Sequence, residues 1–289
     1  LQPNTLEALG LEQFDAWGNR VDRVHLTAFW QQAPAIAARH GLIATAYDST
    51  WGQHARLHHF ALVYLFTASS EFYSCPLAMT DGAARCLIES GNRLLIDRAV
   101  PHFTSRDPAQ FWTSGQWMTE TTGGSDVGGI ETTARNVDGV WRLTGDKWFC
   151  SHADADVALL LARPEGAGPG TRGVGLFLMP RYLDDGSQNH YRIVRLKDKL
   201  GTRSMASGEI KFEGAIAYAV GKLDRGFVQM AEMVNSSRLS NGVKSTALMR
   251  RAHHDAMTVA RNRVVFGQRI IDLPLARRQL MKIALPTEQ

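Results

Sequence analysis

The N-terminal third of the chain contains three segments in which apolar residues recur every three or four positions. Each segment is long enough for a helix, and they cover residues 28–40, 55–73 and 83–100. Apolar residues at this spacing line one face of an α-helix, which packs against a core. We therefore predict a helical domain over residues 1–115. Pro34 marks a kink or a boundary in it, because proline disrupts a helix interior.

Beyond residue 115 the apolar residues alternate with polar ones, and turn residues become frequent. Short apolar runs are separated by segments rich in Gly, Asp, Asn and Ser, and they cover residues 157–162, 174–179, 191–196 and 209–212. This pattern is typical of β-strands. Asp138 and Gly139 accept the positive φ of a type I′ turn, which predicts a hairpin around them. Residues 116–224 are therefore predicted to form a central antiparallel β-barrel domain.

The helical spacing returns after Gly226 and continues to the end of the chain. Gly267 is expected to cap the middle of three helices, which cover residues 227–234, 239–265 and 273–285. Residues 225–289 would then be the first helices of a C-terminal helical bundle, incomplete as they stand. The predicted fold class is a multidomain α+β protein, with a helical domain, a β-barrel and the start of a helical bundle.

Composition narrows the class of protein. The 289 residues are 44% hydrophobic and 21% charged, which is the balance of a folded globular protein and excludes intrinsic disorder as the main state. No apolar run reaches the roughly 18 residues of a membrane-spanning helix. Three cysteines, an odd and small number, cannot build a disulfide framework and favour a reducing compartment. The sequence therefore predicts a cytoplasmic protein without a membrane span.

Charge is concentrated near the C-terminus. Residues 238–289 contain ten basic and three acidic side chains, a net charge of +7, so the rest of the chain carries −3 of the total of +4. A basic segment of this kind attracts an anionic partner, such as a nucleotide cofactor, coenzyme A, a nucleic acid or an acidic subunit surface. The alternative is a solvated helical face with no partner.

Four short segments carry residues suited to binding a flat, polar ligand. In residues 117–126, paired glycines let the backbone approach a ligand, and Thr and Ser hydroxyls donate hydrogen bonds. In residues 145–151, an aromatic pair precedes a hydroxyl, which suits a heteroaromatic ring packed on its face and bonded at its edge. The other two segments cover residues 199–204 and 263–267. Adjacent histidines such as His58 and His59 point about 100° apart on a helix, so no metal site is predicted.

Taken together, the four segments resemble the acyl-CoA dehydrogenase family of flavoproteins. The family patterns T-E-x-x-x-G-S-D, G-x-K-x-W-I-T/S, K-L-G-x-R-S and R-x-x-F-G are matched, in this order, by residues 119–126, 145–151, 199–204 and 263–267. The match covers about residues 75–285. Within the family, Cys75-Pro76 and the sequence from Lys147 to Ser151 are most similar to the AidB branch, the adaptive-response alkylation protein and its relatives.

The resemblance implies FAD as the cofactor and assigns roles to individual residues. Positions that line the flavin or contact it are matched by Met118, Thr119, Gly124 and Ser125. Phe149 and Ser151 match residues that pack on the isoalloxazine ring and hydrogen-bond to it near N5, although most members have Trp where this chain has Phe149.

The resemblance also implies contacts across subunits and with the substrate. Arg263 and Phe266 match residues that reach the FAD of a neighbouring subunit. Arg238 lies at a position near the acyl-CoA site, and Ser125 can also face the coenzyme A side. Pro274 stands close to a position at which many members carry a flavin-contacting Gln. The implied partners are an acyl-CoA or related thioester, electron-transfer flavoprotein or oxygen as electron acceptor, and further copies of the chain in a dimer or tetramer.

The general base of the family reaction has no candidate in the sequence. Some members carry this glutamate next to the position matched by Arg238, but Ser237 occupies that place, and Glu232 lies on a different helix face. We therefore expect the base beyond Gln289, and a chain truncated at both ends, since it starts at Leu1 rather than Met.

Two functions remain open from the sequence. The first is an FAD-dependent acyl-CoA dehydrogenase that transfers the β-hydride to flavin N5 after removal of the α-proton. The alternative is an AidB-like flavoprotein that binds DNA through its basic C-terminal helical region, with weak or vestigial dehydrogenase activity. Against the alternative, residues 250–278 lack interleaved aromatic residues and any known groove-reading motif.

Overall fold

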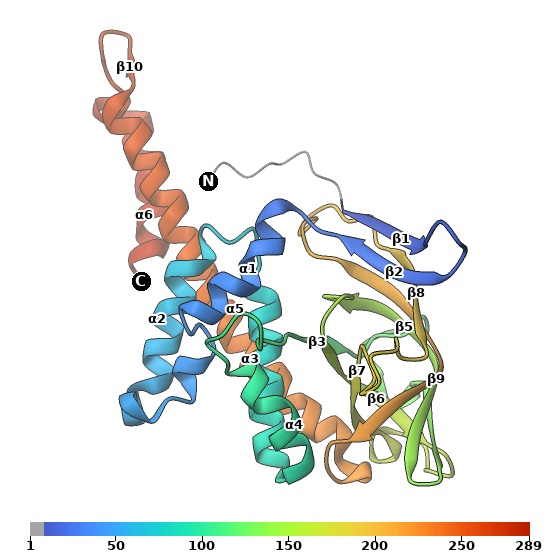
Figure 1. The fold of residues 1–289 in the computed structure, drawn as a ribbon. Coiled ribbons are helices and arrows are strands. Elements are labelled where there is room, and N and C mark those ends of the chain that lie inside the picture. The colour runs from blue at the N-terminus through green and yellow to red at the C-terminus, as the bar shows by residue number, and fades with distance from the viewer. Residues whose placement is uncertain (1–8) are drawn as a thin grey trace.

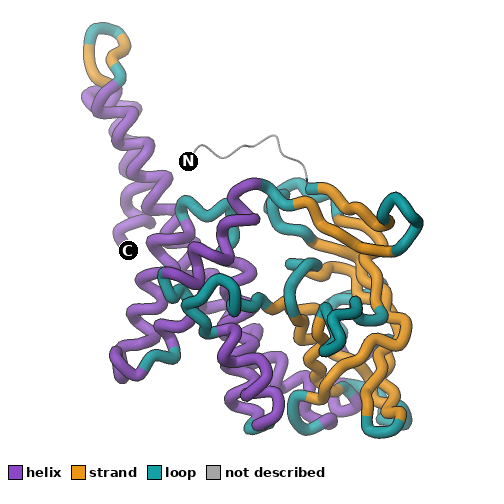
Figure 2. Tube along the Cα trace, in the orientation of Figure 1, coloured by secondary structure: helices purple, strands orange, loops and turns teal. Residues whose placement is uncertain are grey.

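The computed structural model describes residues 9–289 and arranges them as N-terminal helices, a central sheet and a long C-terminal helical arm (Figure 1). Figure 2 shows that most strands gather on one side of the molecule and most helices on the other, with a small hairpin at the tip of the arm. The predictions for residues 1–8 lie outside the described residues.

The N-terminal helices are α1 (Ala28–Arg39), α2 (Ala55–Thr67), α3 (Ser74–Ser90) and α4 (Arg93–Phe103). The predicted helix over 83–100 is wrong as a single element, because Gly91 ends α3 at φ +69° and the Asn92 side chain caps α4 by accepting from Leu95 N. Pro34 lies inside α1 and is not a boundary. The apolar spacing therefore predicted the helices well but not the break between α3 and α4.

A β-hairpin precedes these helices and corrects the prediction of a purely helical first domain. It consists of β1 (Gly10–Phe14) and β2 (Arg20–His25). The Gln13 amide donates to the carbonyls of Ile193 and Val194 at 3.0 Å, and the Asp22 carboxylate accepts from Ile193 N at 2.9 Å. These contacts attach the hairpin to the central sheet rather than to the helices.

The central part is a seven-stranded sheet in the order β3-β5-β4-β6-β7-β9-β8, with additional pairings of β3 with β6 and of β5 with β9. Its strands are β3 (Ser114–Trp117), β4 (Thr133–Val137), β5 (Val140–Ser151), β6 (Val157–Pro164), β7 (Gly175–Pro180), β8 (Tyr191–Leu196) and β9 (Ser207–Ala219). Asp138 and Gly139 form the predicted hairpin turn, both with positive φ.

The predicted antiparallel barrel needs one correction, because β6 runs parallel to both β3 and β4. Parallel neighbours need a long connection, and here that connection contains β5. Alternating apolar residues do not report strand direction, so the sequence pattern could not show this. The architecture of N-terminal helices, a mostly antiparallel sheet and C-terminal helices is confirmed.

Strand β6 places its side chains in two cores. Val157, Leu159 and Leu161 pack with helix residues such as Leu87 and Met230. The alternate residues of the strand pack inside the sheet with large side chains, among them Trp117, Phe177 and Phe212. A strand buried on both faces reads as a continuous apolar run. β6 therefore ties the sheet to the helices.

The C-terminal part is dominated by one helix, α5 (Gly226–Asn262), of 37 residues. At about 1.5 Å per residue it is roughly 55 Å long, and the predicted break near residue 235 is wrong. A small hairpin, β10 (Val264–Val265) with β11 (Gln268–Arg269), then leads to α6 (Pro274–Glu288). Gly267 is not a helix cap, because it forms the hairpin turn at φ +76°. No helix of residues 9–289 is long and apolar enough to cross a membrane.

Candidate functional site

The ends of β3 and β5 bring four of the predicted flavin residues together. Gln116 pairs with Ser151 in the sheet, and the Trp117 indole donates to the Ser151 carbonyl at 3.0 Å. One step further, Trp148 N donates to the Thr119 carbonyl at 2.8 Å. Met118 and Thr119 therefore lie beside Phe149 and Ser151, although about 30 residues separate the two segments.

A buried ion pair holds the segment after β3 against β5. The Lys147 ammonium lies 2.6 Å from Glu120 Oε1, and both side chains are almost fully buried. The Glu120 carboxylate also accepts hydrogen bonds from Glu131 N and from the Thr132 hydroxyl, each at 2.6 Å. Burial acts to raise the pKa of Glu120, but the Lys147 ammonium and these hydrogen bonds outweigh it and lower the pKa from its ordinary value. Glu120 is therefore an ionised anchor for the polar turn that follows it.

This turn carries Gly124 and Ser125 on the surface of the molecule. Glu120 and Gly123 form a bridge that closes the turn, and Gly123 has φ +128°. A Cβ at Gly124 would lie 2.7 Å from Thr119 Oγ1, so a larger residue would displace the turn or the threonine. Ser125 is exposed. The predicted residues of the first motif thus form one compact group.

A β-bulge turns Phe149 outward. The register between β5 and β9 shifts between Lys147 and Cys150, so Trp148 and Phe149 lie opposite a single residue, Glu209. The Phe149 side chain is 50% exposed, although Cys150 beside it is fully buried. The bulge therefore presents an aromatic ring at the surface next to Ser151.

A basic side chain borders this ring. Lys197 Nζ lies 4.5 Å from the centre of the Phe149 ring and 3.2 Å from that of Trp148. The same ammonium is 2.6 Å from Glu209 Oε1, which Arg195 also contacts at 2.8 Å. The sequence did not single out this cluster, because its members come from β5, from β9 and from the end of β8 with the residue after it.

Helix α5 passes close to strand β3, next to the group of predicted flavin residues. The Ser237 hydroxyl lies 3.5 Å from Gln116 Oε1, at the position that the sequence matched to a family glutamate. Arg238 is exposed and contacts Asn235 on its own helix at 3.3 Å. Glu232 lines a separate cavity of about 230 Å³ together with Cys86, Glu89 and Gln229. Glu232 therefore does not face the Ser151 region, as expected.

Arg263 and Phe266 lie elsewhere. Both belong to the hairpin segment after α5, which Figure 1 shows at the far end of the arm from the sheet. Phe266 is 92% exposed, with φ +51° in the turn. Within one chain these residues do not meet Ser151, so any contact with the same ligand must come from a second copy.

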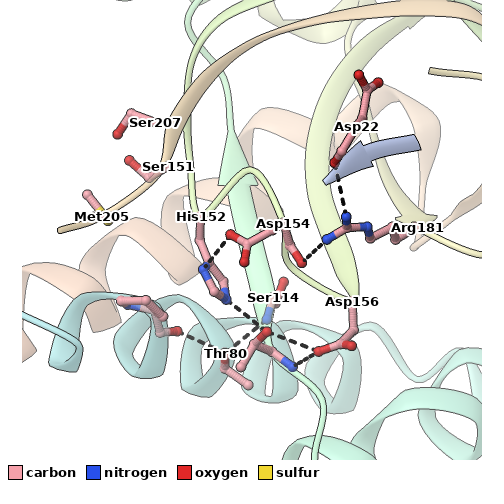
Figure 3. A network of polar contacts seen from close by, with 12 residues as sticks. Asp22, Thr80, Ser114, Ser151, His152, Asp154, Asp156, Arg181, Met205 and Ser207 are labelled. Carbon is pink, nitrogen blue, oxygen red and sulfur yellow. Dashed lines mark hydrogen bonds and ion pairs between the residues drawn. The ribbon is translucent and has the colours of Figure 1, made fainter. Parts of the chain in front are cut away.

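Sequence reasoning missed the groups that hold the site in place. Glu120 and Lys147 were part of the motifs, but nothing in their spacing marked them as a buried pair. His152, which follows Ser151, was not considered, although it lies in the polar network of Figure 3. In residues 9–289, no group of three or more His, Cys, Asp or Glu side chains is arranged to hold a metal ion.

Three family models match the chain in succession. The AidB N-terminal domain of the adaptive response protein matches residues 8–107, the middle domain of acyl-CoA dehydrogenases matches residues 115–215, and their C-terminal domain matches residues 224–289. Together they cover nearly the whole chain.

Individual relatives agree with these matches. Acyl-CoA dehydrogenase family member 11 of Caenorhabditis elegans is 42% identical over 98% of this chain and 47% of its own length. Putative acyl-CoA dehydrogenase AidB of Escherichia coli is 35% identical over 96% of this chain and 52% of its own length. The chain therefore spans about half the length of the curated relatives that it matches.

A solved structure shows the same fold. The crystal structure of Caenorhabditis elegans ACDH-11 in complex with C11-CoA superposes with a TM-score of 0.92 at 41% identity, over 98% of this chain and 49% of that one. The sequence motifs, the domain models and the fold agree. The chain belongs to the acyl-CoA dehydrogenase family, and its N-terminal part is of the AidB type.

Proposed function

We propose that this chain forms the flavin-binding half of an FAD-dependent acyl-CoA dehydrogenase-like oxidoreductase. The observation that carries the proposal is the Ser151 hydroxyl. It has no hydrogen-bond partner among the described residues, and it lies beside the half-exposed ring of Phe149. A free hydroxyl next to an outward-facing aromatic ring suits a planar heteroaromatic ligand such as an isoalloxazine.

The residues around Ser151 fit FAD chemically. Phe149 would pack on the ring, Ser151 would donate to an acceptor at its edge, and Met118 and Thr119 would line it. The turn at Gly124 and Ser125 offers backbone and hydroxyl groups to the ligand, and a side chain at Gly124 would collide with Thr119. When bound, FAD would supply the acceptor for the β-hydride of an acyl-CoA substrate.

Within this proposal, Arg238 and Ser125 border the substrate, and no residue of the described part of the chain is assigned as the general base. Ser237 cannot serve as the base, because an alcohol is too weakly basic to remove an α-proton unaided. We retain domain boundaries near residues 115 and 225 as part of the proposal.

The electron acceptor would be electron-transfer flavoprotein or oxygen; one relative of 27% identity is a subunit of a caffeyl-CoA reductase-Etf complex. A cytoplasmic location is likewise proposed.

Arg263 and Phe266 would reach the FAD of a second copy in a homo-oligomer. Arg263 has no carboxylate partner among residues 9–289 and is exposed, so it is available for a pyrophosphate. Phe266 at the hairpin tip exposes 92% of its side chain, which suits an aromatic residue that packs against another copy.

DNA binding is less well supported than flavin binding. Several basic side chains in the C-terminal region are already paired with acidic ones, namely Arg250 with Glu288, Arg251 with Asp255 and Arg269 with Asp272. Each such pair reduces the positive charge that phosphates would meet. The alternative function therefore predicts a steep salt dependence of duplex binding, whereas we expect no affinity at low salt.

The decisive experiment is to purify the full-length protein and record its flavin absorbance. We expect a yellow protein that holds FAD, and a colourless protein that gains no flavin absorbance when FAD is added would end the proposal. Arg263→Ala should lower the FAD content more than Lys211→Ala does. Equal FAD content in the two variants would argue against the contact between subunits.

A further inference from the structure

His152 follows Ser151 directly and has an unusual backbone conformation. Its φ is +56°, and only 4% of the residue is exposed. Residues with a Cβ rarely adopt this left-handed backbone conformation, although His is enriched among those that do. Such strain persists only where the surroundings determine it, and it gathers at ligand sites. The contacts of the His152 side chain should therefore explain why the chain turns here.

The His152 ring makes one hydrogen bond and faces a carboxylate with its other nitrogen (Figure 3). Nε2 lies 2.9 Å from Thr113 Oγ1, and Nδ1 lies 3.4 Å from Asp154 Oδ1. The Thr113 hydroxyl donates to Asp156 Oδ2 at 3.0 Å, so its oxygen accepts from His152 Nε2–H. Asp154 is itself held in place, because Arg181 donates to its carbonyl at 2.6 Å. The imidazole is thus fixed by the hydrogen bond at Nε2, whereas Nδ1 faces the Asp154 carboxylate without a hydrogen bond.

Two aromatic side chains of the N-terminal part border the same ring. The ring centres of Trp30 and Tyr73 lie 6.2 and 6.3 Å from that of His152. Trp30 and Tyr73 are fully buried and pack edge to face on each other at 4.8 Å. The Trp30 indole donates to the Glu71 carbonyl at 3.1 Å. His152 therefore joins the sheet to the N-terminal helices.

Ser151 is held on every side except at its hydroxyl. Its backbone pairs with Gln116 of β3 and Ser207 of β9, and its carbonyl accepts from the Trp117 indole. Figure 3 shows His152 directed away from Ser151, towards the helix that carries Thr80. The residue after Ser151 is thus anchored inside the protein, while the Ser151 hydroxyl has no hydrogen-bond partner among residues 9–289.

We propose that His152 is the positioning residue of Ser151. Its anchored ring keeps the left-handed turn that directs the Ser151 hydroxyl to the edge of the flavin, so the packing of Trp30 and Tyr73 sets the geometry of the flavin site. This inference rests on the proposed function. His152 acts only through Ser151 and does not touch the ligand.

A double-mutant cycle in the full-length protein tests the inference. Ser151→Ala should weaken FAD binding about three- to tenfold, the effect of losing one hydrogen bond, and should shift the visible absorption band of the flavin. His152→Asn keeps a residue that tolerates positive φ but removes the ring, so we expect a similar loss and a shift in the same direction. The double variant should bind FAD no more weakly than Ser151→Ala alone.

His102→Asn is the matched control. This histidine also has one hydrogen bond, with the Gln110 carbonyl at 2.8 Å, and one aromatic neighbour, Trp112, at 3.9 Å. Its loss should leave the affinity for FAD and the flavin spectrum unchanged. If His152→Asn does not fold, His152→Gly tests the same point, because glycine adopts the turn without strain.

Each outcome decides one question. Losses that multiply in the double variant, or wild-type binding and spectrum in His152→Asn, would overturn the positioning role and leave the proposed function intact. A wild-type protein that binds no FAD would remove both the function and this inference. Weakened binding in His102→Asn to the same degree would show a general loss of stability and would also overturn it.

Discussion

The buried pair of Glu120 and Lys147 gives a prediction that can be worked out from the structure. Replacing Lys147 by Met keeps most of the packing volume but leaves the Glu120 carboxylate buried without a counter-ion. Removal of one partner of a buried pair costs about 3–5 kcal/mol, because the remaining charge has lost its compensation. Glu120 would retain its hydrogen bonds from Glu131 N and Thr132, so the lower end of this range is expected.

The expected change in melting temperature follows from the length of the chain. Unfolding entropies of about 2.1 cal/mol/K per residue give roughly 0.6 kcal/mol/K for 289 residues that unfold together. A loss of about 3 kcal/mol, the lower end of the range, then lowers Tm by about 5 °C, which calorimetry measures directly. The double variant Glu120→Gln with Lys147→Met buries no charge and should recover most of this loss.

The same variant should change the pH dependence of stability. In the native protein the pKa of Glu120 lies below its ordinary value of 4.5, so its contribution is present above that pH and is lost as pH falls through the folded pKa. Without Lys147, burial raises this pKa, and protonation then relieves the unpaired charge. The deficit of Lys147→Met should therefore be largest at neutral pH and shrink towards pH 4. A deficit below about 1 kcal/mol at pH 7, or one that grows on acidification, would refute this reasoning.

Three further predictions concern the turn, the thiols and the helix contacts. Gly124→Ala should weaken FAD binding in a fluorescence titration, since the new Cβ would meet Thr119 Oγ1 at 2.7 Å. In the control Gly168→Ala the new Cβ has open space, so this variant should bind FAD with the affinity of the wild type. Equal affinities of the two variants would contradict the tight turn. Burial raises the pKa of Cys86 to about 12 and also raises that of Cys150. Iodoacetamide at pH 8 should therefore modify neither thiol until the protein is unfolded. Rapid labelling of the folded protein, detected by mass spectrometry, would refute the burial of both thiols. Asp81→Asn should cost about 3 kcal/mol in thermal unfolding, because it breaks the contact of the buried Asp81 carboxylate with Arg56 at 2.7 Å. Asp184→Asn breaks an exposed pair with Arg98 and should cost less than about 1 kcal/mol. The reverse order would show that burial is not the deciding factor.

The spacing of apolar residues predicted the helical regions and most strands, and the Asp138-Gly139 pair predicted the hairpin, but the break between α3 and α4 was missed. It failed where polar residues are buried for a specific reason. The apparent break in α5 lies at Ser236 and Ser237, whose hydroxyls face Asp81 and Gln116, so the helix continues through a polar contact rather than ending. A periodicity of apolar residues cannot distinguish a polar contact inside the fold from solvent.

The candidate site was predictable in its motifs but not in its geometry. Thr119 and Ser151 were recognised as members of two separate sequence motifs. The pairing of β3 with β5 brings these motifs together in the structure. The bulge that exposes Phe149 depends on the register between β5 and β9, which no local pattern encodes. His152 was missed for the same reason, since its partners Thr113 and Trp30 lie 39 and 122 positions earlier in the chain.

The long arm of α5 has a consequence for how the cofactor would be retained. Its hairpin holds Phe266 about 55 Å of helix away from the start of α5, and residues 9–289 leave 92% of it exposed. If this hairpin completes the flavin site of another copy, the binding of FAD and the association of chains become linked equilibria. Dilution would then release FAD, and saturating FAD would hold the copies together, so cofactor occupancy would report protein concentration as well as cofactor supply.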